Sequence, residues 1–405
     1  MKKGKKQNRS LFYRISAWLH LWLGLASGIV VVIVSLTGAA LTFEEELRVL
    51  LQPYQKVQDE GRPLLPPSVL ADAVKKTYHV PGVSAVIYRG RDRSAVIPWY
   101  GDQSNYLVNF VNPYTAEPLH SQPLNSDFFR IMIEGHYQLW LPRDIGKPIV
   151  AYSTLIFVIT LITGLVLWWP KKWTTSTRRQ SFFVRTKATI KRLNYDLHNV
   201  LGFYAISIAL VLALTGMVFG MEWFSKTVYW TASGGQEKSF SRVSSDTTLV
   251  AIDPAREEDR LFASLNRADT DFGENMITIG YPFGKAGTWS VAVNPDMGKR
   301  FREQRSYYEQ KSLRLLKKDP AFSEGNGGDK LSRLNYDLHV GAIGGITTKI
   351  IAFLACIISA SLPVTGFVIW FGKKRKQKKK SVVRRAAVTI NTPAGSYTTV
   401  PGERQ

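Results

Sequence analysis

The chain has 405 residues, of which 45% are hydrophobic, and a formal net charge of +22. Its apolar residues gather in four runs, near 17–43, 149–169, 197–222 and 344–371. Each run is long enough for the roughly 20 residues that a helix needs to cross a bilayer. The stretch GIVVVIVSLTGAALTF has no polar face to turn toward water, which excludes a soluble bundle of amphipathic helices. We therefore expect four transmembrane helices in a lipid bilayer.

The excess of positive charge is confined to three short segments. Residues 1–19, 170–196 and 372–405 together hold 24 Lys and Arg against two acidic residues, and the rest of the chain is balanced. This positive-inside pattern predicts a cytoplasmic N-terminus (1–16), a cytoplasmic loop (170–196) and a basic, disordered cytoplasmic tail (372–405). The tail sequence KKRKQKKK would also permit nucleic-acid binding, but its place directly after an apolar run favours anionic lipid.

The first apolar run, 17–43, is expected to stay in the protein as a helix. It is too long for the apolar region of a secretory signal, and no small-residue cleavage site precedes the acidic triplet at 44–46. The segment that follows it, 44–148, then lies outside the cytoplasm, as does 223–343 after the third run. The only cysteine, Cys356, lies in the last run, so no intramolecular disulfide can form.

The two outer segments share short β-like runs separated by turn residues. Both contain Val-Asn-Pro ahead of a turn, in YLVNFVNPYTAEPL (106–119) and WSVAVNPDMGKRF (289–301). The sequence therefore predicts one small α+β module in each outer segment.

The heptapeptide RLNYDLH occurs twice, at 192–198 and 333–339, and belongs to a wider pattern. Four times an arginine precedes a histidine by six residues, and four times the apolar run that follows carries Thr-Gly near its far end. The distance from histidine to threonine alternates between 17, 27, 17 and 26 residues, which indicates a helix pair used twice. His79 and His120 fall outside the pattern. Its members are Arg14/His20 with Thr37-Gly38, Arg130/His136 with Thr163-Gly164, Arg192/His198 with Thr215-Gly216, and Arg333/His339 with Thr365-Gly366.

The alternating direction of the helices places His20 and His198 near the cytoplasmic face, and His136 and His339 near the outer face. Two histidines at each level predict axial ligation of two haems b per chain. The four arginines would bind propionates, and the four glycines would let a porphyrin edge approach the backbone. Because Pro142, Gly146 and Pro148 follow His136, two placements stay open for it, within its membrane helix or on a short segment before that helix. A histidine-bound metal ion, a proton relay, and small residues at plain helix contacts remain alternatives.

Over residues 11–372 the chain resembles the PepSY-associated transmembrane proteins, also called iron-regulated membrane proteins. The resemblance rests on WLHLWLGLASG, GHYQLWLPRDIGKPIV with LITGLVLWWP, RLNYDLHNVLGFY with LTGMVFG, LNYDLHVGAIGG with LPVTGFVIWFG, and VNPYTAEPL. One departure concerns the PepSY turn, which usually carries Thr-Gly. Here it is Thr115-Ala116, and the second copy has Met297-Gly298.

The resemblance implies a multi-pass protein of the bacterial inner membrane that reduces a ferric siderophore or another ferric chelate for iron acquisition. The chain has no G-x-G-x-x-G, so a separate cytoplasmic or quinone donor would supply the electrons. Tyr88, Arg89, Arg91 and Arg93 are candidates for chelate docking, although a solvated charged hairpin is the simpler interpretation. The alternative function is a non-enzymatic membrane regulator, or a partner of a siderophore uptake system. A transporter is less favoured, since four helices leave little room for alternating access.

Overall fold

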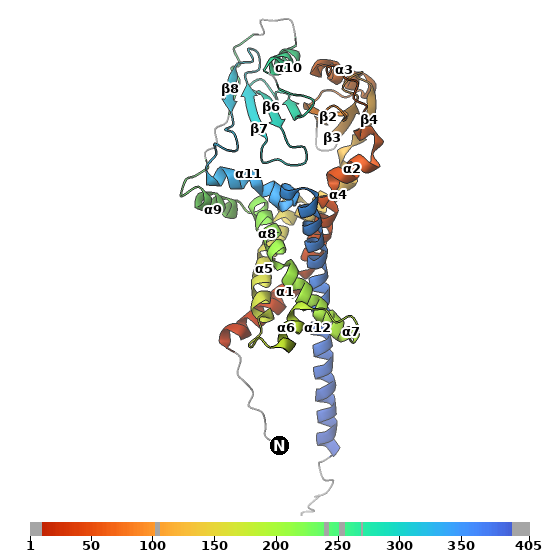
Figure 1. The fold of residues 1–405 in the computed structure, drawn as a ribbon, viewed down its shortest axis with the longest axis vertical. Coiled ribbons are helices and arrows are strands. Elements are labelled where there is room, and N and C mark those ends of the chain that lie inside the picture. Colours follow the sequence, from red (N-terminus) through yellow and green to blue (C-terminus); the bar gives the residue numbers. More distant parts are fainter. Residues whose placement is uncertain (1–9, 102–105, 239–242, 251–255, 269, 391–405) are drawn as a thin grey trace, which may run out of the picture.

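The computed structural model describes residues 10–101, 106–238, 243–250, 256–268 and 270–390, with side chains up to residue 375 in the last helix. A bundle of long helices carries a β-sheet domain at one end (Figure 1). We call that end of the bundle the sheet end and the opposite one the far end. Helix α1 begins and helix α12 ends at the far end (Figure 1). The predicted N-terminal segment 1–16 falls mostly outside the described residues.

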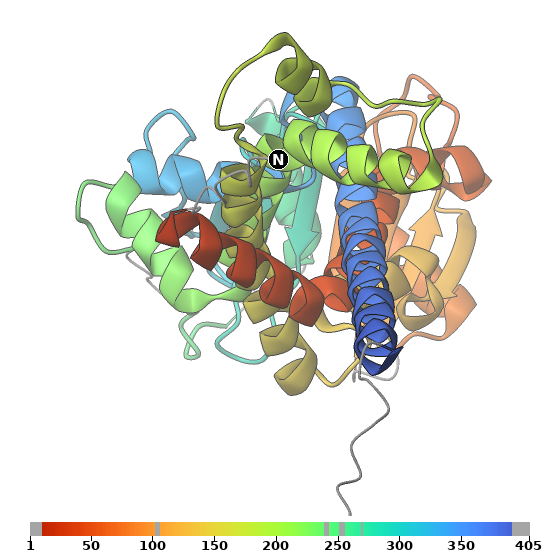
Figure 2. The ribbon, with the colours of Figure 1, turned by 90° about the horizontal axis from the view of Figure 1, so that it is seen from below.

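Four helices are long and apolar enough to cross a membrane: α1 (Leu11–Thr42), α5 (Arg143–Trp168), α8 (Gly202–Gly220) with the turns before it, and α12 (Ile346–Ile390). Helix α1 packs against α5 and α12, and α8 packs against the same two helices. The four helices therefore surround one axis, as the view along the bundle shows (Figure 2). The protein is a multi-pass membrane protein.

Three of the four helices are preceded by shorter helical pieces that carry the histidines. Helix α4 (Phe128–Gln138) precedes α5, and α11 (Gly327–His339) precedes α12, with a 3₁₀ turn over Ala342–Gly344 between them. Helix α7 (Ile190–Asp196) leads through a π-helical turn (Leu197–Leu201) into α8. His136 thus lies on α4, before the membrane helix. Leu139 and Trp140 have positive φ and Pro142 caps α5, so the chain turns sharply there.

The segment 372–390 differs from the predicted disordered tail, because α12 continues to Ile390. Lysine, arginine, glutamine and alanine dominate this stretch, and these residues have high helix propensity, so a helix already formed in the bundle extends through them. Residues 391–405 of the predicted tail lie outside the described residues.

The outer segments form one antiparallel sheet of eight strands, in the order β4-β3-β2-β1-β5-β6-β7-β8. The first segment supplies α3 (Pro67–Tyr78) and the second supplies α10 (Glu257–Arg267). The strands are β1 (Ala85–Arg89), β2 (Ala95–Tyr100), β3 (Tyr106–Val111), β4 (Pro118–Pro123), β5 (Met276–Gly280), β6 (Trp289–Asn294), β7 (Gln304–Tyr308) and β8 (Leu315–Lys318).

The prediction of two separate α+β modules is wrong in one respect. Each segment does contribute four strands and one helix packed on them, α3 or α10, but β1 pairs with β5 along five residues and joins the two halves. Val86 on β1 and Ile277 on β5 are fully buried in a core shared with Leu70 of α3 and Leu261 of α10. Because neither half buries these apolar residues alone, the halves pack as one domain.

The two Val-Asn-Pro segments use the same local device at different places in the sheet. Asn112 and Asn294 each accept a hydrogen bond from the backbone N–H two residues later. Four residues after each asparagine, Ala116 (φ 61°) and Gly298 (φ 90°) adopt left-handed conformations. The first segment joins β3 to β4, whereas the second joins β6 to β7. The match therefore reflects a shared turn rather than equivalent positions in two modules.

Short helices connect the two parts of the molecule. Helix α2 (Glu44–Leu51) continues α1 toward the sheet, with a 3₁₀ turn over Pro53–Gln55, and α9 (Glu222–Ala232) follows α8 and packs on α11. A 3₁₀ turn over Leu124–Ser126 precedes α4, and α6 (Thr175–Phe182) lies in the far-end loop (Figure 1).

Candidate functional site: two histidine pairs in the bundle

The four histidines of the sequence pattern meet as two facing pairs. His20 on α1 faces His198 in the π-helical turn, with ring centroids 6.2 Å apart. His136 on α4 faces His339 on α11, with ring centroids 5.9 Å apart. We call these the far-end pair and the sheet-end pair. The structure therefore brings together the histidines that the topology argument groups at each membrane level.

Each histidine rests on the Thr-Gly pair of another helix. The Nδ1 atom of His136 lies 2.9 Å from the Val34 carbonyl oxygen and 3.3 Å from the Thr37 hydroxyl. The other three repeat this contact: Nδ1 of His20 lies 3.0 Å from the Thr160 oxygen and 3.4 Å from the Thr163 hydroxyl, Nδ1 of His339 lies 3.1 Å from the Leu212 oxygen and 3.0 Å from the Thr215 hydroxyl, and Nδ1 of His198 lies 2.9 Å from the Thr365 hydroxyl.

These contacts set the tautomer of the rings. For His20, His136 and His339 the partner is a backbone carbonyl, which only accepts hydrogen bonds, so Nδ1 carries the proton and Nε2 keeps its lone pair. For His198 the partner is the Thr365 hydroxyl, which donates to backbone carbonyls and therefore accepts from Nδ1. Within the described part of the chain, no hydrogen-bond donor approaches Nε2 in either pair. An imidazole held through Nδ1–H with a free Nε2 is the form that ligates metals in proteins.

The glycines of the Thr-Gly pairs lie directly beside the histidine rings. A Cβ on Gly38 would lie 2.9 Å from Cε1 of His136, and a Cβ on Gly164 would lie 3.0 Å from Cε1 of His20. Gly216 stands in the same relation to His339, and Gly366 to His198, at 3.2 Å. In each case the imidazole ring lies against the glycine. We call each Thr-Gly pair, together with the backbone carbonyl three residues before the threonine, a histidine seat.

The seats are exchanged within each helix pair. His20 of α1 rests on α5, and His136 at the start of the α4–α5 unit rests on α1. In the same way His198 rests on α12, and His339 rests on α8. Each helix pair thus fixes one histidine at the far end and one at the sheet end.

Two further residues of RLNYDLH support the seats. Asn194 and Asn335 donate from Nδ2 to the carbonyls of Thr365 and Thr215, the same threonines that contact the histidines. Sequence analysis missed this role, although the exact repetition of the asparagine was a signal for it.

The aspartates of the heptapeptide hold loops against the histidine-bearing helices. Asp337 is fully buried and accepts hydrogen bonds from the backbone N–H groups of Arg300 and Phe301. Asp196 is also fully buried and accepts one from the N–H of Arg185. The repeated heptapeptide therefore positions the histidine and anchors its surroundings.

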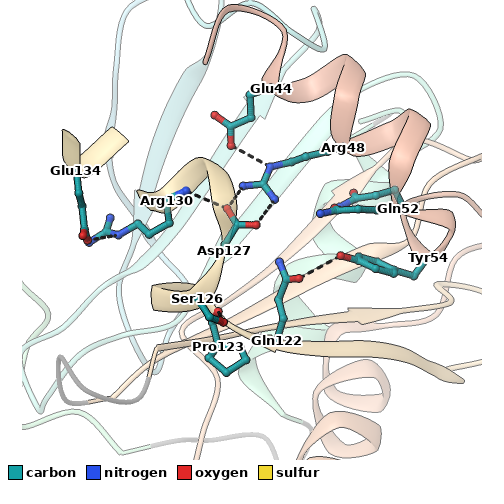
Figure 3. Close-up of polar contacts among 11 residues, drawn as sticks. Glu44, Arg48, Gln52, Tyr54, Gln122, Pro123, Ser126, Asp127, Arg130 and Glu134 are labelled. Atoms are coloured by element: carbon teal, nitrogen blue, oxygen red, sulfur yellow. Dashed lines mark hydrogen bonds and ion pairs between the residues drawn. The ribbon is translucent and has the colours of Figure 1, made fainter. Parts of the chain in front are cut away.

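The four predicted arginines fall into three situations. Arg192 lies 2.8 Å from Asp196, and Arg130 lies 2.9 Å from Glu134 (Figure 3). Arg333 donates to the Glu303 carbonyl, and Arg14 is exposed. Nε of Arg130 and Nη2 of Arg192 are the atoms in these two ion pairs, and among the described residues Nε of Arg192 is buried without a hydrogen-bond partner. Nε of Arg192, near the far-end pair, is thus a buried donor that an anionic group would satisfy.

The donor set fits a ligand held between two imidazoles. A metal–imidazole bond is about 2 Å long, so one metal atom between two opposed rings places their centroids about 6 Å apart. Within the described ranges, no group of three or more His, Cys, Asp or Glu side chains could hold a metal ion. Two facing histidines at each end, with Arg130 and Arg192 on the same helical segments, fit haem iron and its propionates. A three- or four-ligand zinc site does not fit.

The family model described as the PepSY-associated TM region matches residues 17–373. The chain belongs to this family. The PepSY-associated match covers all four histidines and all four seats, together with both outer segments. It agrees with a membrane protein of the iron-regulated type. No curated protein matches the chain.

Proposed function

We propose that this PepSY-associated protein is a di-haem b oxidoreductase that passes electrons across the membrane to a ferric chelate. The observation that carries the proposal is the pair of facing histidines at each end of the bundle, all four fixed through Nδ1. Haem b bound at both pairs would supply one-electron transfer, since iron with two axial histidines has no open position for oxygen chemistry. The exchanged seats further support the duplication of one helix pair.

The far end is assigned to the cytoplasm of a bacterial inner membrane, because the basic segments lie there. A groove of about 530 Å³ opens at this end between the start of α1 and the end of α5. Tyr13, Leu165, Trp169 and Lys171 contribute to its walls. Leu165 directly follows Gly164 of the His20 seat, so a quinol or a cytoplasmic reductant in this groove would stand next to the far-end pair.

The sheet domain is assigned to the periplasmic side, where it covers the sheet-end pair. Each electron delivered there would convert one Fe³⁺ of a ferric siderophore or similar chelate to Fe²⁺. The domain supplies the surface on which such a chelate would dock, and the histidines and their seats hold the redox groups below it.

The haem content of the purified protein tests the proposal. We expect about two haems per chain, with a low-spin b-type spectrum on reduction. His20→Ala and His198→Ala should each abolish one signal, and His136→Ala and His339→Ala the other. His79→Ala and His120→Ala are the controls, since His79 caps α3 and His120 stacks on Tyr54 in the sheet domain.

Vesicles test the direction of transfer. With reductant inside a sealed vesicle and ferric chelate outside, the double variant His136→Ala, His339→Ala should keep a reducible far-end haem but leave the chelate ferric. A colourless protein from haem-replete cells would instead favour the non-enzymatic regulator or siderophore-uptake partner.

A further inference from the structure

A small cavity lies at the junction between the bundle and the sheet domain, where α2 meets the strands β1 and β5. Its volume is about 60 Å³. It lies at the seam between the two halves of the sheet, because Arg89 and Met276 on its wall are paired across β1 and β5. We call it the arginine cavity. Its main lining residues are Glu45, Arg48, Gln55, Arg89, Arg93 and Met297.

Positive charge in the arginine cavity exceeds negative charge. Three guanidinium groups line it against one carboxylate, that of Glu45. Arg48 is balanced from outside, since it donates to Asp127 at 2.8 Å and to Glu44 at 2.9 Å (Figure 3). Arg93 has only a loose contact with the exposed Asp92, at 3.8 Å.

Arg89 is the least compensated of the three. Its guanidinium donates to Gln55 Oε1 at 2.6 Å, to the Ser94 carbonyl at 3.0 Å and to the Ser94 hydroxyl at 2.8 Å, all neutral acceptors. In the part of the chain that the structure describes, no carboxylate lies within 4.0 Å of it. Burial, together with the neighbouring Arg93, lowers the pKa of Arg89 to about 10, which still leaves it charged at neutral pH.

Glu45 compensates Arg89 only from a distance, and a buried cation with distant compensation is costly unless an anion joins it. Guanidinium groups bind carboxylate and phosphate through two parallel hydrogen bonds, so an arginine cluster selects oxyanions. A space of this size is far below the roughly 300–1,000 Å³ of ordinary ligand pockets. It has room for a single anionic group but not for the body of a large ligand.

We propose that the arginine cavity binds one oxyanion group of carboxylate or phosphate size. The group comes either from a free inorganic anion or from the acidic arm of the ferric chelate; the second case rests on the proposed function. Glu45 follows Gly38 of the His136 seat by seven residues, about 10 Å of helical rise. An acidic arm held here would keep its ferric centre outside the cavity, close to the sheet-end pair.

Equilibrium binding to the purified full-length protein tests the proposal. The probes are inorganic phosphate, citrate, ferric citrate and a ferric trihydroxamate that has no carboxylate, each titrated by calorimetry. Arg93→Gln removes a charge whose ion pair with Asp92 is loose, and Met297→Trp fills the cavity from a side chain that is 44% exposed. Arg91→Gln is the matched control, since Arg91 is exposed on the same hairpin and lies outside the cavity.

We expect citrate or phosphate to bind, with affinity at least about tenfold weaker in Arg93→Gln and Met297→Trp and unchanged in Arg91→Gln. Binding of phosphate as strongly as citrate identifies a free anion as the occupant, and binding of citrate and ferric citrate alone identifies the acidic arm. The affinity for the trihydroxamate should be the same in the wild type and in all three variants. Absence of saturable binding by any oxyanion, or equal losses in all three variants, overturns the proposal.

The outcome is separable from that of the proposed function. Oxyanion binding needs no haem, so a colourless protein could still bind citrate through Arg93. Conversely, if the protein carries two haems and reduces chelates but binds no oxyanion, the proposed function stands and the arginine cavity is not a binding site.

Discussion

Replacing Gly38 by alanine is a direct test of the histidine seats. The new Cβ would lie 2.9 Å from Cε1 and 3.3 Å from Nδ1 of His136, whereas ordinary contacts begin at 3.4 Å. The ring must therefore move by at least about 0.5 Å, which is the tolerance within which a functional site holds its geometry. The move also strains the hydrogen bond from Nδ1 to the Val34 carbonyl, now 2.9 Å long.

Changes to groups that orient a metal-bound histidine typically weaken metal binding about 10- to 100-fold. We expect a loss of this size for haem at the sheet-end pair in Gly38→Ala, with the far-end haem retained. The measurement is the haem-to-protein ratio, together with the rate at which a haem-scavenging apoprotein removes each haem. Gly216→Ala, where the contact would be 3.2 Å from His339, should have a smaller effect on the same haem.

Gly24→Ala is the matched control on the same helix. Its Cβ would meet only Thr160 Cγ2, at 3.7 Å, and alanine is favoured over glycine in a helix by up to about 1 kcal/mol. If Gly38→Ala kept both haems, with the loss rates of Gly24→Ala, the seat would not position His136 and this reasoning would be refuted.

Three further predictions concern single side chains. Thr365→Val removes the hydroxyl 2.9 Å from Nδ1 of His198, so a redox titration should show a shifted midpoint for the far-end haem only; equal shifts of both would contradict the seat. Ala116→Gly relieves a residue held at φ 61° and should raise the free energy of unfolding of the sheet domain by about 0.5–1 kcal/mol, measured with denaturant. Burial alone would raise the pKa of Glu309, but donation from the Ser312 N–H and hydroxyl holds it below its ordinary value. The contribution of the ionised Glu309 carboxylate to stability is therefore present above the ordinary pKa of glutamate and is lost as the pH falls through the lowered pKa of the folded protein. The difference in melting temperature between wild type and Glu309→Gln should then shrink on acidification. A difference that stays constant with pH would argue against this role.

The helices and the grouping of histidines could be predicted because their signals are local. Apolar runs report membrane helices directly, and the spacing from His20 to Thr37 converts into a position along one helix. Pro142 indicated a break after His136 but left open whether His136 lies within or before the membrane helix, and the structure places it on the separate helix α4.

The remaining features depend on contacts between distant parts of the chain. The pairing of 85–89 with 276–280 leaves no local trace, so two modules were predicted where one domain forms. The residues predicted as candidates for chelate docking differ in exposure for the same reason. Tyr88 is 1% exposed, because it lies in the core that the two halves share, whereas Arg91 is exposed. A glycine beside an imidazole and a glycine beside a porphyrin have the same sequence signal, and only the fold distinguishes them.

The exchange of seats has a consequence for how the protein is assembled. Each helix pair is complete in its own seats, yet it supplies only one of the two histidines at either level. A ligand that needs both histidines binds the joined halves and neither half alone, so its binding free energy adds to the affinity between them. If the chain were cut within 170–196, each fragment would carry two membrane helices and four strands of the sheet. Co-expressed fragments should then associate more tightly in cells that make haem than in cells that do not, with the cofactor acting as a cross-link between two half-proteins.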